Sequence, residues 1–230
     1  MSYKLNALVP KHLAESCKRN KIKLIHISTD YVFSQYDTII RLRHINDVPF
    51  PCNVYGQHKL IGELFIENEF GKDNKDWTIL RTSWLYGAHT SKSFVHKFMN
   101  VVKKTIQSGS KTVQMTSNEF SVPTSTFFVS EAIRSCLLND KYHGILHAVP
   151  TASQSVSRLD FAKAILNSFP ANTEYCGVKL TDIEIEGVVR DTYQPTYSAL
   201  YTSFSHMMPG CDWLQLLEKF IHKNADELLK

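Results

Sequence analysis

The amino-acid sequence predicts an α/β fold organised around a parallel sheet. Short apolar runs rich in β-branched residues, such as IKLIHI (22–27) and WTILRT (77–82), alternate along the chain with longer amphipathic segments. This alternation is typical of strand–helix–strand units, in which a helix connects two parallel strands. The chain has 230 residues, of which 43% are hydrophobic, so it is long enough to bury a substantial core.

The elements expected in the first half are a helix within 5–19, a strand at 22–27, a long loop at 28–50, a helix at 53–68, a strand at 77–82 and a helix at 93–108. Pro10 marks either a first turn or a kink in the first helix. The last of these helices is assigned because Phe94, Phe98, Val101 and Val102 recur on one side of it.

The elements expected in the second half are a strand at 112–115, a helix at 125–138, a strand at 144–149, a helix beginning near Ser157, a strand at 183–189 and a closing helix at 212–229. Ser157 and Asp160 have the S-x-x-D spacing of a helix start before an apolar run. The polar loop NEFSVPT (118–124) signals a turn, and residues 190–211 are expected to be irregular or short helix.

The charge pattern argues against a nucleic-acid-binding protein. The net charge is +4 and is spread along the chain. Lys18-Arg19 and Lys103-Lys104 are short basic clusters that do not continue into a stripe. We therefore interpret them as solvated helix faces, since nucleic-acid binding needs positive charge gathered on one face.

Cysteine and histidine spacing gives no sign of a metal site. The five cysteines include no CxxC pair, and the ten histidines have no ligand spacing such as HExxH. We expect neither a disulfide framework nor an essential metal. The cysteine pattern indicates that the protein resides in a reducing compartment. No apolar run reaches the roughly 18 residues of a membrane span, and the N-terminus lacks the apolar core of a signal peptide. The sequence therefore predicts a cytoplasmic protein that binds no membrane.

Tyr55 and Lys59 form the first candidate for chemistry. Their spacing of four near the start of a helix places both side chains on one face. An ammonium beside a phenol favours the phenolate and so lowers the tyrosine pKa. A tyrosine tuned in this way can pass a proton to a carbonyl oxygen while hydride arrives at the carbon. Taken alone, the pattern arises often by chance, and a surface pair on a helix is the more frequent explanation for it.

Two strand ends strengthen this candidate. Ser28-Thr29-Asp30 follows the 22–27 strand directly, and Ser83-Trp84 follows the 77–82 strand. Ligands in open α/β sheets bind at the carboxyl ends of the strands. A hydroxyl at such a place can bond a substrate carbonyl or the tyrosine, and Trp84 offers a flat face for a sugar ring or base. Core packing is an equally plausible role for Trp84.

Several strings together resemble the dTDP-4-dehydrorhamnose reductase family of extended short-chain dehydrogenase/reductases. They are HISTDYVF (26–33), NVYGQHKLIGE (53–63), LRTSWLYG (80–87), NEFSVPT (118–124), GILHAV (144–149) and QPTYSAL (194–200). Their order and spacing match the family over nearly the whole chain. The family reduces a 4-keto-6-deoxy sugar nucleotide with NADPH or NADH.

The resemblance implies roles for particular residues. Thr29, Tyr55 and Lys59 correspond to the catalytic set, and Tyr55 and Lys59 also contact the cofactor. The residues implied in the sugar-nucleotide pocket are Asp30, Tyr31, Trp84 and Phe94. Asn6 is a weaker candidate for a supporting polar group.

The resemblance also implies a fold. It is a partial Rossmann-type parallel sheet over residues 1–115, which carries the Tyr-x-x-x-Lys site, and a smaller C-terminal α/β substrate-binding region over residues 116–230, with the two intertwined. The glycine-rich turn G-x-x-G-x-x-G, which seats the pyrophosphate of a dinucleotide, does not occur in these residues. The 22–27 strand would then be an apolar sheet edge. We expect a partner chain, a homo-oligomer, swapping or a rearranged N-terminal segment to cover it.

Three other functions remain open at this point. The chain could be a non-catalytic docking subunit, similar to the regulatory β subunit of methionine adenosyltransferase. It could catalyse 4-epimerisation or dehydration of a nucleotide sugar, for which a dehydratase needs a further acid and base. It could also be a truncated remnant that folds poorly. Retention of Thr29, Tyr55 and Lys59 together favours the reductase.

Overall fold

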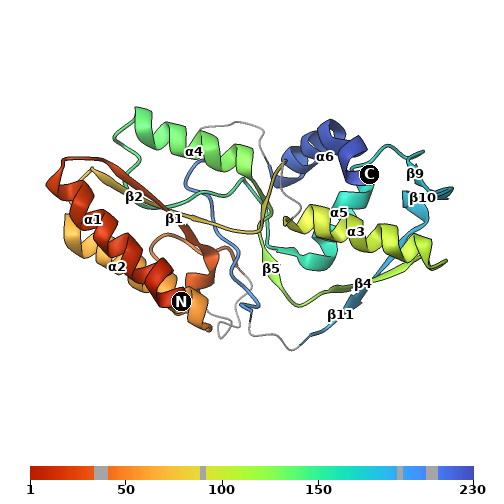
Figure 1. The fold of residues 1–230 in the computed structure, drawn as a ribbon, viewed down its shortest axis with the longest axis horizontal. Coiled ribbons are helices and arrows are strands. Elements are labelled where there is room, and N and C mark those ends of the chain that lie inside the picture. Colours follow the sequence, from red (N-terminus) through yellow and green to blue (C-terminus); the bar gives the residue numbers. More distant parts are fainter. Residues whose placement is uncertain (34–40, 89–91, 191–193, 206–211) are drawn as a thin grey trace.

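The computed structural model describes residues 1–33, 41–88, 92–190, 194–205 and 212–230, and it has the α/β architecture that the sequence predicts (Figure 1). A three-stranded parallel sheet has the order β1-β2-β7. Its strands are β1 (Leu24–Thr29), β2 (Trp77–Thr82) and β7 (Gly144–His147). The central position of β2 explains why all six of its residues are buried.

Helices cover the two faces of this sheet. The helices α1 (Val9–Arg19) and α2 (Val54–Phe70) lie on one face, and α4 (Thr126–Leu138) lies on the other (Figure 1). Alternate residues of β2 point to opposite faces. Ile79 accordingly packs with Ile66 of α2, whereas Leu80 packs with Phe128 of α4.

A second region holds the largest apolar cluster. Its strands β4 (Thr112–Thr116) and β11 (Glu184–Val188) pair in parallel, and three helices pack beside them: α3 (Phe94–Gln107), α5 (Arg158–Asn167) and α6 (Trp213–Leu229). The core of this region includes Phe98, Val102, Phe161, Ile165, Leu217 and Ile221. The chain crosses between the two regions more than once, because α3 and β4 precede α4 and β7. The division near residue 115 stays a prediction.

Short elements complete the fold. A π-helical turn (Lys4–Leu8) leads into α1, and Pro10 lies in the first turn of α1, the first of the two expected alternatives. The remaining elements are β3 (Leu85–Tyr86), β5 (Phe120–Ser121), β6 (Thr124–Ser125), β8 (Val156–Ser157), β9 (Glu174–Tyr175), β10 (Val178–Lys179) and two single 3₁₀ turns, Asp30–Val32 and Leu180–Asp182. Strands of two residues are too short to show a period, so the sequence did not predict them.

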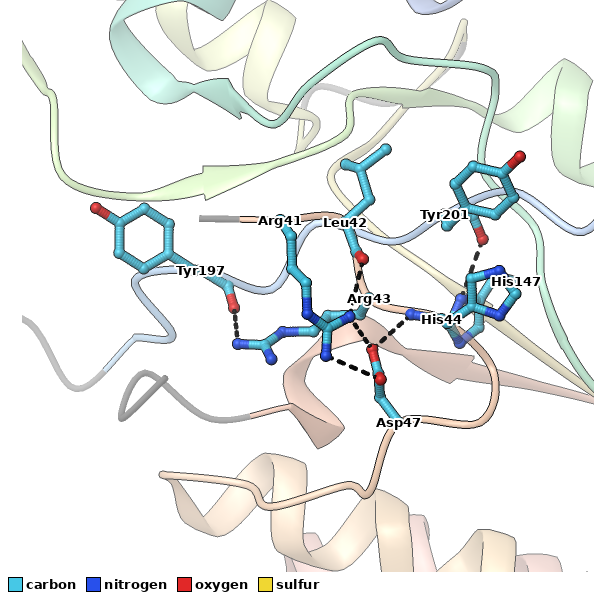
Figure 2. Close-up of polar contacts among 8 residues, drawn as sticks. All are labelled: Arg41, Leu42, Arg43, His44, Asp47, His147, Tyr197 and Tyr201. Carbon is cyan, nitrogen blue, oxygen red and sulfur yellow. Dashed lines mark hydrogen bonds and ion pairs between the residues drawn. The ribbon is translucent and has the colours of Figure 1, made fainter. Parts of the chain in front are cut away.

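Residues 194–201, here called the strap, are held by long-range hydrogen bonds. Figure 2 shows part of this contact, where an Arg43 guanidinium nitrogen donates to the Tyr197 carbonyl at 3.4 Å. The Arg43 amide donates to Ala199 at 2.7 Å, and the Tyr201 amide donates to Arg43 at 2.8 Å. Asp47 forms an ion pair of 2.5 Å with Arg41 and so stabilises the loop that carries Arg43. The strap thus has a defined position without regular secondary structure.

The edge of the sheet at β1 is open within the part of the chain that the structure describes. No described strand pairs with the side of β1 opposite β2. The helix α1 packs on α2 and on the sheet face, and Ile27 is 36% exposed. The described N-terminal residues therefore do not cover this edge. Covering by a second chain stays a prediction.

A buried ion pair joins α2 to the centre of the sheet. Glu63 and Arg81 are each about 2% exposed at the side chain, and an Arg81 nitrogen lies 2.7 Å from the Glu63 carboxylate. The Arg81 Nε atom donates to both carboxylate oxygens at 3.2 Å, and the Ser28 hydroxyl donates to one of them. The pair therefore connects β1, α2 and β2 at one point.

Replacing Glu63 should destabilise the fold strongly. We expect Glu63→Gln to lower the free energy of unfolding by about 3–5 kcal/mol, because it leaves the Arg81 charge buried and unpaired. Urea unfolding followed by circular dichroism measures this change.

Glu67→Gln is the matched control. Glu67 lies one turn further along α2 and pairs at 3.8 Å with Lys72, whose side chain is 84% exposed. Such a pair contributes at most about 1 kcal/mol. If both variants lost the same free energy of unfolding, the buried pair would have no special role in stability.

Candidate active site

A cavity of about 320 Å³ lies at the carboxyl ends of β1 and β2. It is lined by the residues that end these two strands and by the first turns of α2: Ile27, Ser28, Thr29, Asp30, Tyr31, Tyr55, Lys59, Thr82, Ser83, Trp84 and Leu85. All three predicted catalytic residues and three of the four predicted substrate-binding residues meet here. Phe94 is not among the lining residues.

The start of α2 is pressed closely against the end of β1. The Asn53 side chain caps the helix by accepting from the Gly56 amide at 2.8 Å. A Cβ atom at Gly56 would lie only 2.1 Å from the Tyr31 carbonyl oxygen, so only glycine permits this approach. The rings of Tyr31 and Tyr55 consequently meet edge to face at 5.9 Å, and Tyr55 remains 43% exposed at the cavity.

Lys59 is buried and points at the backbone of β1. Its ammonium donates to the Ile27 carbonyl at 2.6 Å and lies 3.2 Å from His26 Nε2. Burial, followed by the charge of Lys59, lowers the pKa of His26 to about 4, so this imidazole is neutral and can accept a hydrogen bond. Two of the three ammonium N–H groups are thereby directed at β1.

The pKa of Tyr55 differs from our expectation. Burial raises it, the Asp30 charge raises it further, and a hydrogen bond with the Thr29 side chain acts in the opposite direction. We expected Lys59 to lower this pKa, but Lys59 is not among the groups that act on it. The physical reason is that the ammonium faces Ile27 and His26. In this arrangement Tyr55 is a protonated phenol.

Asp30 is fully enclosed by hydroxyl groups. Its Oδ2 atom accepts from Ser121 at 2.7 Å and from Ser198 of the strap at 2.6 Å, and its Oδ1 atom accepts from Thr29 at 3.2 Å. Burial raises the pKa of the Asp30 carboxyl, against the opposing effect of these hydroxyls. Asp30 lines the cavity, but its oxygens are occupied in holding β5 and the strap to the end of β1.

Arg158 is the site residue that sequence reasoning missed. Its guanidinium lies over the Trp84 ring at 3.6 Å and over the Phe94 ring at 4.8 Å, and its Nε atom is 3.5 Å from a Glu119 carboxylate oxygen. The flat face that we expected Trp84 to offer a sugar ring thus carries Arg158. Phe94 contacts the same cation and, like Trp84, stacks on Phe161, at 5.0 Å and 6.1 Å respectively.

The sequence offered one weak signal for this group, and the backbone of the folded chain adds a second. Arg158 is the first residue of α5, where a cation is unfavourable because the helix dipole is positive at its N-terminus. Trp84 has a φ of +38°, a strained backbone conformation for a bulky residue that is often found at functional sites. Asn6, the weaker candidate, donates to Ser2 and does not line the cavity.

The described residues also bear on metal binding and membrane insertion. No group of three or more His, Cys, Asp or Glu side chains among them could hold a metal ion. No described helix has the length and apolar character needed to cross a bilayer. The four described cysteines are free thiols.

Fold and site together define the class of protein. A parallel sheet with Thr29 at one strand end and a Tyr-x-x-x-Lys helix packed beside it is the arrangement of a Rossmann-type short-chain dehydrogenase/reductase. The family model described as the RmlD substrate binding domain matches residues 1–225. The chain therefore belongs to this family.

Individual relatives agree with the assignment. A dTDP-4-dehydrorhamnose reductase of Mycolicibacterium smegmatis is 27% identical over 220 residues, which cover 94% of this chain and 62% of that protein. The crystal structure of a dTDP-4-dehydrorhamnose reductase from Clostridium acetobutylicum is 25% identical, with a TM-score of 0.75 over 97% of this chain and 73% of that one.

The fold is shared more widely than the reaction. A UDP-galactose 4-epimerase structure has a TM-score of 0.70 at 15% identity and covers 99% of this chain and 71% of its own. At that identity the likeness shows the fold alone. The fold by itself therefore does not determine the function.

The protonation of Asp30 should make the free energy of unfolding depend on pH. A carboxyl with a raised folded-state pKa contributes stability that is fully present below its unfolded pKa of about 3.9 and is lost as pH rises through the folded pKa. We expect wild type to lose stability relative to Asp30→Asn as pH rises from about 4 toward neutrality. Urea unfolding of both proteins across this range measures the difference.

Asn is a suitable replacement because it keeps the shape and carries no charge at any pH. Asp182→Asn, at an exposed carboxylate beside Lys111, serves as the control and should show no such trend. A wild-type advantage that grows with pH would overturn the assigned direction.

Proposed function

We propose that this chain carries the proton-donating and substrate-binding part of an NAD(P)H-dependent reductase that acts on a 4-keto-6-deoxy sugar nucleotide. The observation that carries the proposal is the meeting of Thr29, Tyr55 and Lys59 in one cavity at the carboxyl ends of β1 and β2. Membership of the family and the names of its relatives support the substrate class. The chain spans 62% of the length of the curated relatives it matches first, so activity of the whole protein is part of the proposal.

Tyr55 acts as the general acid in this reaction. Its raised pKa keeps the phenol protonated until a substrate carbonyl binds, and the phenol then donates its proton to the carbonyl oxygen. The Thr29 hydroxyl, which shares a hydrogen bond with Tyr55, orients the phenol toward that oxygen. A reduced nicotinamide, when bound beside Lys59, would supply the hydride for the carbonyl carbon.

The residues present fit the nicotinamide end of such a cofactor. Lys59 uses two of its N–H groups on Ile27 and His26 and has one left for a ribose hydroxyl. The glycine-rich turn that would seat the pyrophosphate does not occur in the sequence. The proposed contact of Lys59 suits NADPH and NADH alike, because the two cofactors share the nicotinamide ribose and differ at the adenosine ribose.

We propose that Arg158, which lies beside the cavity, binds the diphosphate of the sugar nucleotide. Its side chain is 17% exposed and is held against Trp84, which lines the cavity. Arg158 Nε is 3.5 Å from Glu119, which is longer than a strong charge-assisted hydrogen bond. A phosphate group can therefore take up the remaining N–H groups of the guanidinium.

The site gives less support to the alternatives. A dehydratase needs a second acid or base, and Asp30 is the nearest candidate. The Asp30 carboxylate is only 2% exposed and already accepts from Ser121, Ser198 and Thr29. No observation favours a docking subunit.

Location and assembly complete the proposal. We propose that the protein resides in the cytoplasm. Its small-molecule partner is the sugar-nucleotide substrate. We also propose that a second chain, in a homo-oligomer or another assembly, covers the open edge of β1. The apolar character of that edge, with Ile27 partly exposed, supports this assembly.

The Tyr55→Phe variant tests the mechanism. We expect it to lower turnover of dTDP-4-dehydrorhamnose by about 10²–10⁴-fold, because it removes the proton donor and little else. Oxidation of the nicotinamide measures turnover, and calorimetry with a dTDP-sugar measures binding, which should be nearly unchanged.

Tyr3→Phe is the matched control, because Tyr3 is also partly exposed and does not line the cavity. Unchanged turnover in Tyr55→Phe would disprove the mechanism. Titration of the chain with NADPH and NADH, followed by nicotinamide fluorescence, tests the cofactor separately. Absence of binding at millimolar cofactor would overturn a reductase activity of this chain alone.

The Arg158→Met variant tests the diphosphate site. We expect about tenfold weaker binding of dTDP, equivalent to about 1.4 kcal/mol, with thymidine binding unchanged. Arg134→Met, on the exposed face of α4, should leave both affinities unchanged. If the affinities for dTDP and thymidine fell equally, Arg158 would act by packing alone and not by binding the diphosphate.

A further inference from the structure

A second cavity, of about 740 Å³, lies between the start of α4 and the helix α6. It shares no lining residue with the catalytic cavity. Its volume falls in the range of about 300–1,000 Å³ that is typical of small-molecule sites. Nothing in the proposed reductase reaction uses it.

One wall of this cavity is apolar. Phe127 of α4 is 60% exposed although it is a large hydrophobic residue, and Leu216 and Phe220 of α6 line the same space. Gly87 lies so close to α4 that a Cβ atom there would be 2.2 Å from the Thr126 hydroxyl. Gly87 and Thr126 therefore pack closely at one side of the cavity, where a larger residue than glycine would clash with α4.

The rim of the cavity is positively charged. Lys219 and Lys223 are four residues apart on α6, on the face that also carries Phe220, and both line the cavity. Neither forms an ion pair with a residue that the structure describes, and no carboxylate is among the lining residues. The start of α4, which lines the same space, adds partial positive charge from its backbone N–H groups.

We propose that this cavity is a binding site for a small organic anion with an apolar body. The apolar body packs on Phe127 and Phe220, and the anionic group lies between Lys219 and Lys223. Two ammonium groups that lack a carboxylate partner match a carboxylate, sulfonate or phosphate group, whereas the exposed phenyl ring matches an aromatic or aliphatic body. A fully polar anion would leave Phe127 exposed, and a neutral ligand would leave both lysines without a counter-charge.

Two fluorescent probes of nearly the same shape test both halves of the proposal. Anilinonaphthalene sulfonate carries the anion, and phenylnaphthylamine lacks it. We expect the purified chain to bind one sulfonate probe saturably. Lys219→Glu/Lys223→Glu should weaken this binding by about tenfold or more, equivalent to about 1.4 kcal/mol, and should leave the neutral probe unaffected. Phe127→Ser should weaken binding of both probes.

Lys103→Glu/Lys104→Glu is the matched control, because these two lysines lie on α3, which lines neither cavity. Sulfonate binding that is unchanged in the α6 variant, or lost equally in the α3 control, would overturn the proposal. Tyr55→Phe should bind the sulfonate probe like wild type, so failure here is distinguishable from failure of the reductase mechanism.

Another occupant of the same wall would also be detected. If a second copy of the chain covered Phe127, wild type would sediment as a dimer, Phe127→Ser would sediment as a monomer, and wild type would not bind the sulfonate probe. That outcome would replace the small-anion site with a protein interface.

Discussion

The buried pair of Glu63 and Arg81 is the constraint on which the site depends. Two charges removed from water persist only if they remain paired and hydrogen-bonded, so the carboxylate fixes the distance between α2 and the centre of β2. Glu63 lies one turn beyond Lys59 and two turns beyond Tyr55 on the same helix. The packing of α2 against Arg81 therefore also sets where the phenol and the ammonium meet the end of β1. The ring of Phe33, 5.2 Å from the Arg81 guanidinium, covers the other side of the cation.

A second buried charge joins the sheet to the rest of the molecule. Asp30 follows β1, yet its hydroxyl partners Ser121 and Ser198 come from β5 and from the strap. The strap is bound further along by the Arg43 backbone and by His147. Segments that are more than 160 residues apart in sequence thus converge on one carboxylate. The shape of the cavity depends on this convergence as much as on the sheet itself.

Sequence patterns located the regular elements well, because burial imposes a period on them. The strand expected at 22–27 is observed at Leu24–Thr29, and the helix expected at 53–68 is Val54–Phe70. The shift in β1 arises because Ser28 and Thr29 pair with Arg81 and Thr82 in the ladder, and an apolar pattern does not detect polar ladder residues. Arg158 and the partners of Asp30 could not be found in this way, since only the folded chain brings them together. The direction of Lys59 was missed for the same reason: helical spacing places it beside Tyr55, whereas the Ile27 carbonyl orients its ammonium.

Architecture and acidity are coupled in this site through Asp30. Its charge raises the pKa of Tyr55, whereas the Thr29 hydroxyl lowers it, and Thr29 also donates to Asp30. The same charge acts on the neighbouring Tyr31 in the same direction. Because burial raises the pKa of Asp30 itself, its charge and its hold on the strap respond to the same change in pH. A change that opens the strap would alter both the hydration and the charge of Asp30, and with them the pKa of Tyr55. The acid strength of Tyr55 and the closure of the cavity are therefore not independent properties of this fold.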